Sequence, residues 1–285
     1  MQENYLTGVL PTELGLMTEL IILQLSNNIV SSGIPTQIGI LTKLEVLNLN
    51  YNEMTGTLPT ELGNLTSMDG LSITYNHITG SIPTEIGSLS NITYFEISGN
   101  FMSGPLPSEL GLLTILTTLS VPYNPFNSTI STEIGNLAQL MKFDAVVNLL
   151  TGSLPSEIGR LTKLIILSID INQLTSTIPT EIGNLDELLV FTVSTNNITG
   201  PIPSELGRLT SLIQLTVGDN SITSTIPTEL GNLEQLVSFF AYDNDLTASL
   251  PSELGLLTLL VNCSLYSNHI TGTIPTELEN LAQLP

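Results

Sequence analysis

An asparagine recurs every 24 residues along the chain, with no insertion or deletion between its occurrences. The series is Asn4, Asn28, Asn52, Asn76, Asn100, Asn124, Asn148, Asn172, Asn196, Asn220, Asn244 and Asn268. A fixed period of this length is typical of coils that stack on one another, each touching only its neighbours. We therefore expect residues 1–285 to form a single solenoid domain of about twelve coils. Such a stack presents a long surface rather than one enclosed pocket.

The residues between two asparagines predict the structure of one coil. In residues 44–65 the apolar positions are Leu44, Leu47, Leu49, Met54, Leu58, Leu62 and Leu65. The in-and-out alternation around Asn48 predicts a strand, and stacking of coils is what buries its apolar side. An asparagine amide both donates and accepts hydrogen bonds, so we expect a hydrogen-bonded asparagine ladder that satisfies open backbone groups in the turn.

The second half of the coil predicts a turn and a short helix. Thr55 and Thr57 are expected to point outward from a second, short extended segment. Thr60 has the side chain of an N-cap for one helical or 3₁₀ turn, and Gly63 fits a left-handed stop at its end.

The full pattern, LxxLxxLxLxxNxLTGxIPxELGxL, resembles the plant-type leucine-rich repeat of receptor-like kinase ectodomains and polygalacturonase-inhibiting proteins. This resemblance covers the whole chain. It implies an α/β repeat fold: a right-handed leucine-rich-repeat solenoid with a parallel sheet on its concave face, short second strands, and 3₁₀ or helical turns on the convex side. The chain differs from those receptors in having no paired cysteines, no membrane span and no recognisable polar cap at either end. We therefore expect either that the chain is a fragment of a longer array or that its ends are covered by something outside this sequence.

Composition restricts the partners. With 26 acidic and five basic residues, the net charge of −21 argues against nucleic acid and against anionic membranes, and it favours a basic partner. Cys263 is the single cysteine, so no internal disulfide forms. No apolar run could span a bilayer, and residues 1–20 do not resemble a signal peptide. The family resemblance still favours an extracellular, cell-surface or lumenal location. N-x-S/T triplets that would accept glycans there begin at Asn64, Asn91, Asn127, Asn197 and Asn262.

The chain lacks the convergent groups that an enzyme needs. His77 and His269 occupy the same column eight coils apart, and Cys263 occupies an inward leucine column. No phosphate-binding loop, nucleophile motif or zinc spacing is present. We therefore expect no catalytic residues, no cofactor and no metal.

Aromatic residues gather in the columns next to the asparagine on the concave face. Tyr51, Tyr75 and Tyr123 precede an asparagine, Phe101 follows one, and Tyr94 lies on the same sheet. Neighbouring coils would bring these rings within ~5 Å, and exposed aromatic residues anchor protein interfaces. The alternative is that this column accepts any solvent-facing residue, and that tyrosine favours strands.

A second aromatic group, Phe240, Tyr242 and Tyr266, lies among aspartates at 219, 243 and 245. Such oxygens can bind Ca²⁺, but no loop here would wrap an ion, so a solvated acidic face is favoured. A column of glutamates runs from Glu13 to Glu277, with Gln37 as its gap. The favoured interpretation is that the family resemblance implies glutamate at this position, where the start of a helical turn favours a carboxylate. The alternative is a weak divalent-cation site along the column.

Threonines form a further regular array beside the turn. A flat rank of hydroxyl and methyl groups at coil spacing resembles the ice-contacting face of solenoid antifreeze proteins, although Pro105 and Pro201 interrupt one column. The candidate ice-binding residues are Thr55, Thr57, Thr79, Thr151, Thr175, Thr177, Thr223, Thr225, Thr271 and Thr273.

Three hypotheses follow. The first is a non-enzymatic module that binds a protein or peptide, favourably a basic one, on its concave face. Its contact residues would be Tyr51, Tyr75, Tyr94, Phe101, Tyr123, Phe240, Tyr242 and Tyr266. The second is an ice-binding protein that uses the threonine ranks. The third is a structural subunit that joins a larger assembly through its uncapped ends.

Overall fold

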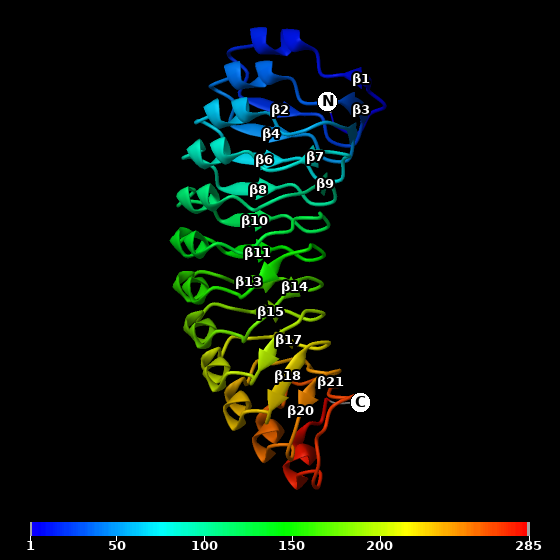
Figure 1. Ribbon diagram of the computed structural model, residues 1–285, viewed down its shortest axis with the longest axis vertical. Helices are drawn as coiled ribbons and strands as arrows, with labels where there is room; N and C mark the ends of the chain where they lie inside the picture. The colour runs from blue at the N-terminus through cyan, green and yellow to red at the C-terminus, as the bar shows by residue number, and fades with distance from the viewer. Residues whose placement is uncertain (1, 284–285) are drawn as a thin grey trace. The chain divides into compact units, whose positions relative to one another are not determined.

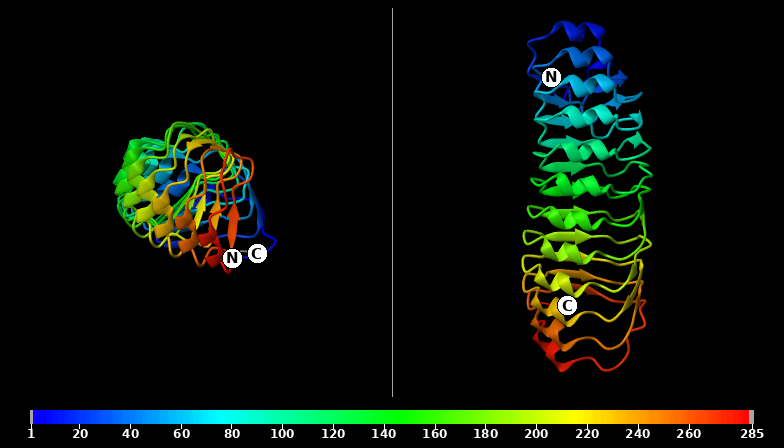
Figure 2. Two further views of the ribbon diagram at one scale, coloured as in Figure 1. Left: turned by 90° about the horizontal axis from the view of Figure 1, so that it is seen from below. Right: turned by 60° about the vertical axis from the view of Figure 1, so that its left-hand side comes forward.

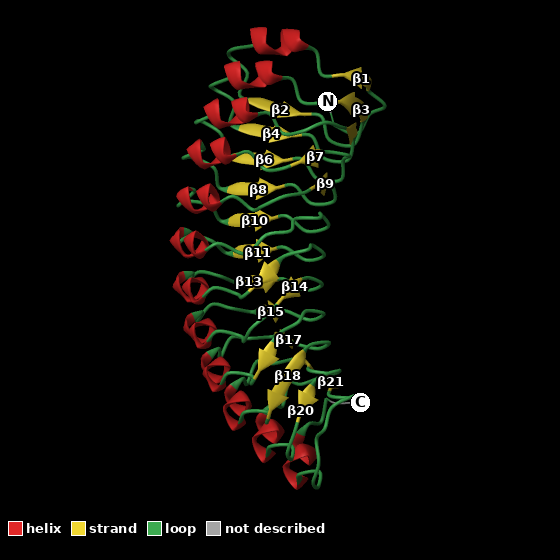
Figure 3. Cartoon of the chain, viewed as in Figure 1, coloured by secondary structure: helices red, strands yellow, loops and turns green. Residues whose placement is uncertain are grey.

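The computed structural model describes residues 2–283 and divides into two compact units, Met1–Leu149 and Leu150–Pro285. Each unit is a stack of 24-residue coils built from β-strands and 3₁₀ helices, with no α-helix among the described residues. In each unit the 3₁₀ helices form a row along one side of the coils, and the strands lie across the coils from them (Figure 1 and Figure 3).

One main strand per coil builds a parallel sheet in each unit. In the first unit these strands are β2 (Ile22–Gln24), β4 (Val46–Asn48), β6 (Gly70–Ser72), β8 (Tyr94–Glu96), β10 (Thr118–Ser120) and β11 (Lys142–Asp144). In the second they are β13 (Ile166–Ser168), β15 (Val190–Thr192), β17 (Gln214–Thr216), β19 (Ser238–Phe240) and β21 (Asn262–Ser264). Partners such as Leu47 and Leu71 are one full period apart, so equivalent residues stand in columns. The stacking of coils is visible in Figure 2.

Short second strands follow the asparagine in most coils. In the first unit they are β1 (Thr7–Val9), β3 (Ile29–Ser32), β5 (Glu53–Met54), β7 (Thr79–Gly80) and β9 (Phe101–Met102). In the second they are β12 (Thr151–Gly152), β14 (Gln173–Leu174), β16 (Thr199–Gly200), β18 (Ser221–Ser224) and β20 (Asp245–Leu246). Their pairing is offset, because Thr79 pairs with Phe101 rather than with Ser103.

Each coil then forms a five-residue 3₁₀ helix. In the first unit these are η1 (Thr12–Leu16), η2 (Thr36–Ile40), η3 (Thr60–Asn64), η4 (Thr84–Ser88), η5 (Ser108–Leu112) and η6 (Thr132–Asn136). In the second they are η7 (Ser156–Arg160), η8 (Thr180–Asn184), η9 (Ser204–Arg208), η10 (Thr228–Asn232), η11 (Ser252–Leu256) and η12 (Thr276–Asn280).

The predicted apolar columns form the core of each unit. Leu47, Met54 and Leu62 are completely buried, and Leu58 is 4% exposed. Larger side chains occupy the same columns in other coils, as with the fully buried Phe95 in the column of Leu47. The strand alternation and the inward leucines were therefore predicted correctly.

The side chains of the asparagine column bind backbone groups of their own coil and of the neighbouring coil. Asn100 Oδ1 accepts a hydrogen bond from the Ile78 amide at 3.0 Å. Its Nδ2 donates to the carbonyl of Ile73 in the preceding coil at 2.7 Å and to that of Ile97 in its own coil at 3.0 Å. Asn100 therefore joins two adjacent coils through their backbones, and its role is structural.

Two predictions about the 3₁₀ helix were wrong. The N-cap of η3 is Pro59, and Thr60 is the first helical residue, with its hydroxyl donating to Glu61 Oε2 at 3.3 Å. Gly63 lies inside η3 and does not have left-handed geometry. A Cβ on Gly63 would lie 2.4 Å from the carbonyl oxygen of Glu85 in the next coil, so glycine is required there for close stacking.

Candidate binding surface

The exposed aromatic residues of the first unit lie on the solvent-facing side of its main sheet and the turn that follows, here called the sheet face. Tyr51, Tyr75 and Tyr123 are 48–53% exposed, and Phe101 is 58% exposed. The rings of Tyr51 and Tyr75 stack with centroids 4.8 Å apart, and those of His77 and Phe101 stack at 5.8 Å. We call these five residues the aromatic strip; within it, Tyr123 has no stacking partner among the described residues.

The turn backbone directs the tyrosines outward. Tyr51, Tyr75 and Tyr123 have φ values of 51–56°, in the left-handed region that non-glycine residues seldom adopt. The same geometry occurs in other coils, where the amide of this residue donates to a carbonyl of the next coil, as Tyr75 does to Ser98 at 2.8 Å. Sequence reasoning missed this conformation, because tyrosine is not a residue that signals it.

Two glycines make room for the rings, and they too escaped sequence reasoning. A Cβ on Gly99 would lie 2.8 Å from the Tyr75 ring, and one on Gly70 would lie 1.7 Å from Tyr94 Cζ. Tyr94 therefore lies flat across Gly70 and is half-buried, whereas Tyr75 is held between Tyr51 and Gly99. The available signal was a glycine inside a column of large residues.

Tyr94 also borders a polar network on the sheet. Burial raises the pKa of its phenol, and the negative charges of Asp69 and Glu96 raise it further. The Ser72 hydroxyl lies 3.1 Å from Glu96 Oε2 and 3.0 Å from Asn50 Oδ1. The Tyr94 hydroxyl consequently stays protonated and available as a hydrogen-bond donor at neutral pH.

The second unit carries its own aromatic group. Tyr242 and Tyr266 stack at 5.1 Å, and a Cβ on Gly218 would lie 2.8 Å from the Tyr242 ring. Partial desolvation raises the pKa of Tyr266, followed by the charge of Asp243 and smaller effects that include Asp219. Phe240, the last residue of β19 and two residues before Tyr242, is half-buried. The structure thus brings Tyr242 and Tyr266 into contact and places Tyr266 beside two aspartates.

Acidic residues outnumber basic ones on both sheet faces. In the first unit Lys142 is the basic residue of a main strand, and its Nζ lies 3.2 Å from Asp144 Oδ2. In the described part of the second unit, Arg160, Lys163 and Arg208 all lie in or just after a 3₁₀ helix and none lies in a main strand. A cationic partner would therefore meet a favourable potential on either face.

The threonine ranks are exposed, but they do not form flat strands. Among the candidate ice-binding residues, Thr151 is half-buried and the others are exposed. A residue with positive φ separates the two threonines of a pair, for example Gly56 (77°) between Thr55 and Thr57 and Ser224 (75°) between Thr223 and Thr225. The extended segment expected between them is therefore interrupted at its centre.

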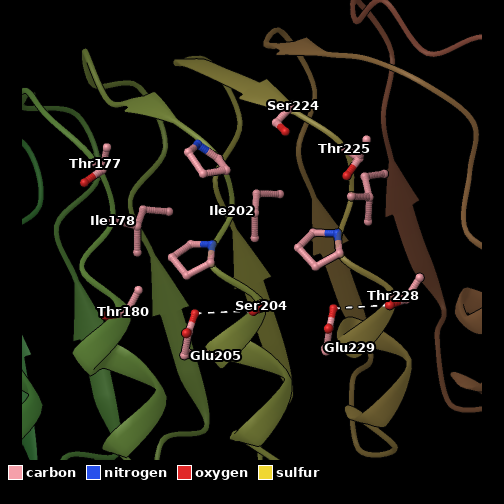
Figure 4. Close-up of a pocket in the computed structure, with 14 residues that line it drawn as sticks. Thr177, Ile178, Thr180, Ile202, Ser204, Glu205, Ser224, Thr225, Thr228 and Glu229 are labelled. Atoms are coloured by element: carbon pink, nitrogen blue, oxygen red, sulfur yellow. Dashed lines mark hydrogen bonds between the residues drawn. The ribbon is translucent and has the colours of Figure 1, made fainter.

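A groove of about 540 Å³ hollows this side of the second unit. Pro201 occupies the column of Thr177 and Thr225, in the coil between theirs. Ile178 and Ile202 lie in the floor of the groove (Figure 4). The column of exposed threonines is therefore neither continuous nor flat at Pro201.

The glutamate column lies at the start of the 3₁₀ helices. The hydroxyl before each glutamate donates to its carboxylate, as Thr228 does to Glu229 at 3.2 Å (Figure 4). Among residues 2–283, no group of three or more His, Cys, Asp or Glu side chains is placed to hold a metal ion. No helix in this described range is long and apolar enough to cross a membrane.

Comparison with known proteins shows the family to which the chain belongs. The model of the leucine-rich repeat matches residues 43–65, and no curated protein sequence matches the chain. The Arabidopsis receptor kinase HAESA, solved with the peptide hormone IDA and the co-receptor SERK1, is 31% identical with a TM-score of 0.95 over 98% of this chain and 47% of that one. The chain spans about half the length of the plant receptor structures that it matches.

Two other structures are similar over more of their own length. The leucine-rich-repeat protein LIC12759 of Leptospira interrogans is 32% identical, with a TM-score of 0.80 over 97% of this chain and 68% of that one. A plant ice-binding protein is 26% identical, with a TM-score of 0.68 over 78% of this chain and 71% of that one.

Proposed function

Because the chain belongs to the leucine-rich-repeat family, with repeats of the plant type, we propose that it is a non-enzymatic module that binds a peptide or protein segment on its sheet face. The similar plant receptor structures include complexes with peptide hormones, which supports a peptide as the class of partner. Fold similarity alone does not specify a ligand, so the proposal depends on the surface itself.

The aromatic strip of the first unit is the observation that carries the proposal. Large side chains that are about half exposed are the anchors that protein interfaces favour. Stacking against a neighbouring ring or a glycine restricts Tyr51, Tyr75, His77 and Phe101 before any partner arrives. Such pre-organisation lowers the entropy lost on binding. In the second unit Phe240, Tyr242 and Tyr266 form a separate candidate contact surface.

The charge of the sheet faces supports a basic partner. Asp144 already has Lys142 as its partner. Asp219 and Asp243 stand beside Tyr266, in the turns that follow β17 and β19, and neither of these two strands contains a lysine or arginine. Attraction between exposed charges is screened by salt, so added salt should weaken capture of a basic peptide. An extracellular location is part of the same proposal. The exposed sequon asparagines support it: Asn64, Asn91, Asn127, Asn197 and Asn262.

The test is selection of peptides from a displayed random library on the wild-type chain, followed by affinity measurements on variants. We expect Tyr75→Ala with Phe101→Ala to weaken the selected peptides at least about tenfold, with an unchanged circular dichroism spectrum. The matched control is Leu112→Ala with Ile115→Ala, which removes two exposed apolar side chains from the 3₁₀ side and should leave affinity unchanged. Equal affinity of both double variants would refute the assignment.

Ice binding is the second candidate, favoured by the similar plant ice-binding structure and by the exposed threonines. The left-handed residue within each pair and the groove at Pro201 weigh against a flat lattice. An ice-recrystallisation assay tests this candidate. Ice binding is supported if the wild-type chain inhibits recrystallisation and the double variant Thr175→Asn, Thr223→Asn does not. It is rejected if the wild-type chain shows no inhibition at high protein concentration.

A further inference from the structure

The groove of the second unit has an apolar floor between two rows of polar side chains. Its volume is about 540 Å³, and its lining residues come from three successive coils. Figure 4 shows Thr177 and Thr225 on one side of Ile202, and Glu205 and Glu229 on the other. None of the lining residues belongs to a main strand, so the groove is separate from the sheet face.

The two glutamates of the groove are not neutralised by the protein. The Ser204 hydroxyl donates to Glu205 Oε2 at 3.5 Å, and the Thr228 hydroxyl donates to Glu229 Oε2 at 3.2 Å. Among the described residues, no donor binds the Oε1 atom of either carboxylate, and neither carboxylate forms an ion pair. The lining contains no lysine, arginine or histidine. Two negative charges therefore stand one coil apart, at about 5 Å, with oxygens available to accept hydrogen bonds.

The floor between the two rows is apolar. Ile178, Ile202 and Ile226 occupy one column and are 2–4% exposed, so their side chains support the floor from below. Proline rings cover the rest of it: Pro201, Pro203 and Pro227. Such a floor suits an apolar side chain, or the aliphatic stem of a lysine or arginine whose charged end reaches a carboxylate.

The charge and the length of the groove select its occupant. A lysine ammonium or an arginine guanidinium supplies the missing donors and reduces the repulsion between Glu205 and Glu229. Three coils place about 10 Å between the two ends of the groove, and about three residues of an extended chain span that length. The exposed hydroxyls of Thr177, Ser224 and Thr225 can hydrogen-bond to the backbone of such a chain.

We propose that this groove is a second docking site, which binds an extended segment of a partner protein in which basic and apolar residues alternate. The two glutamates bind the basic side chains, the isoleucine and proline floor receives the apolar one, and the threonine and serine hydroxyls bind the backbone. The site is independent of the sheet face, and it would remain if the aromatic strip bound no partner.

The test uses a synthetic peptide of three lysine–leucine repeats with both ends blocked. It is titrated into the chain labelled at isoleucine methyl groups, and the Kd is taken from the shifts of the Ile178 and Ile202 signals. These signals report on the groove itself, so binding at a sheet face does not enter the measurement. We expect saturable shifts with a Kd below about 1 mM. Unchanged signals at about 1 mM peptide would overturn the proposal.

Charge-neutral variants separate the groove from the general attraction of an acidic chain. Glu205→Gln with Glu229→Gln should raise the Kd about fivefold, because each removes one ion pair with the peptide. The matched control is Glu61→Gln with Glu85→Gln in the first unit. Those glutamates occupy the same column, one half-buried and one exposed as in the groove, and each accepts a threonine hydroxyl at 3.3 Å. The control should change the Kd less than about twofold, because salt screens distant charges. Equal weakening by both pairs would refute a specific site.

A substitution that fills the groove tests its shape with the charges unchanged. Thr225→Trp should raise the Kd at least about fivefold. Thr57→Trp changes an equally exposed residue of the same column in the first unit and should leave the Kd unchanged. A peptide with serine in place of leucine should bind the wild-type chain more weakly. Wild-type affinity in Thr225→Trp, or equal binding of the serine peptide, would show that the peptide does not occupy the apolar floor.

Discussion

The residue before each ladder asparagine has a positive φ whatever its side chain, and this conformation costs most for β-branched residues. Ile171 has φ 54° and is 47% exposed. Asparagine adopts this region more easily, so we expect Ile171→Asn to stabilise the chain by about 0.5–1 kcal/mol. Urea unfolding measures this, with Ile213→Asn as the control, since Ile213 is 41% exposed and has no positive φ. A similar loss of stability in both variants would contradict the expectation.

The thiol of Cys263 provides a second prediction about a single residue. It occupies a leucine column, and burial raises its pKa to about 11. The thiolate is the reactive form, so at pH 8 alkylation of the folded chain should be on the order of a hundredfold slower than that of the unfolded chain. The rate should rise with pH up to that pKa. Equal rates in folded and unfolded protein would show that the thiol is not shielded.

At the scale of the coil, the glycine of the 3₁₀ helix sets the spacing between neighbours. Gly207→Ala should destabilise the chain by about 2–3 kcal/mol, because its Cβ meets the Glu229 carbonyl oxygen at 2.3 Å. Glu279→Ala changes the equivalent residue of the last coil and should leave the unfolding midpoint unchanged. If both variants unfold at the wild-type midpoint, coil spacing does not depend on this glycine.

The same element shows what the sequence could predict. Met54 and Leu58 are buried as expected, because a 24-residue pattern records which side chains point into the coil. The role of Gly63 was predicted wrongly, because the group that excludes a side chain is a carbonyl of the next coil rather than a neighbour in sequence. The stacking of Tyr51 on Tyr75 followed from the columns, whereas the support from Gly99 did not.

At the scale of the molecule, two stacks of coils each carry an aromatic group on an acidic sheet face. The most direct test of the proposed function is a photo-crosslinking residue, p-benzoylphenylalanine, placed either at Tyr75 on the sheet face or at Leu112 on the 3₁₀ side. A library-selected peptide should crosslink to the chain carrying the probe at position 75 and not to the chain carrying it at position 112. Crosslinking from position 112 alone would contradict binding at the aromatic strip.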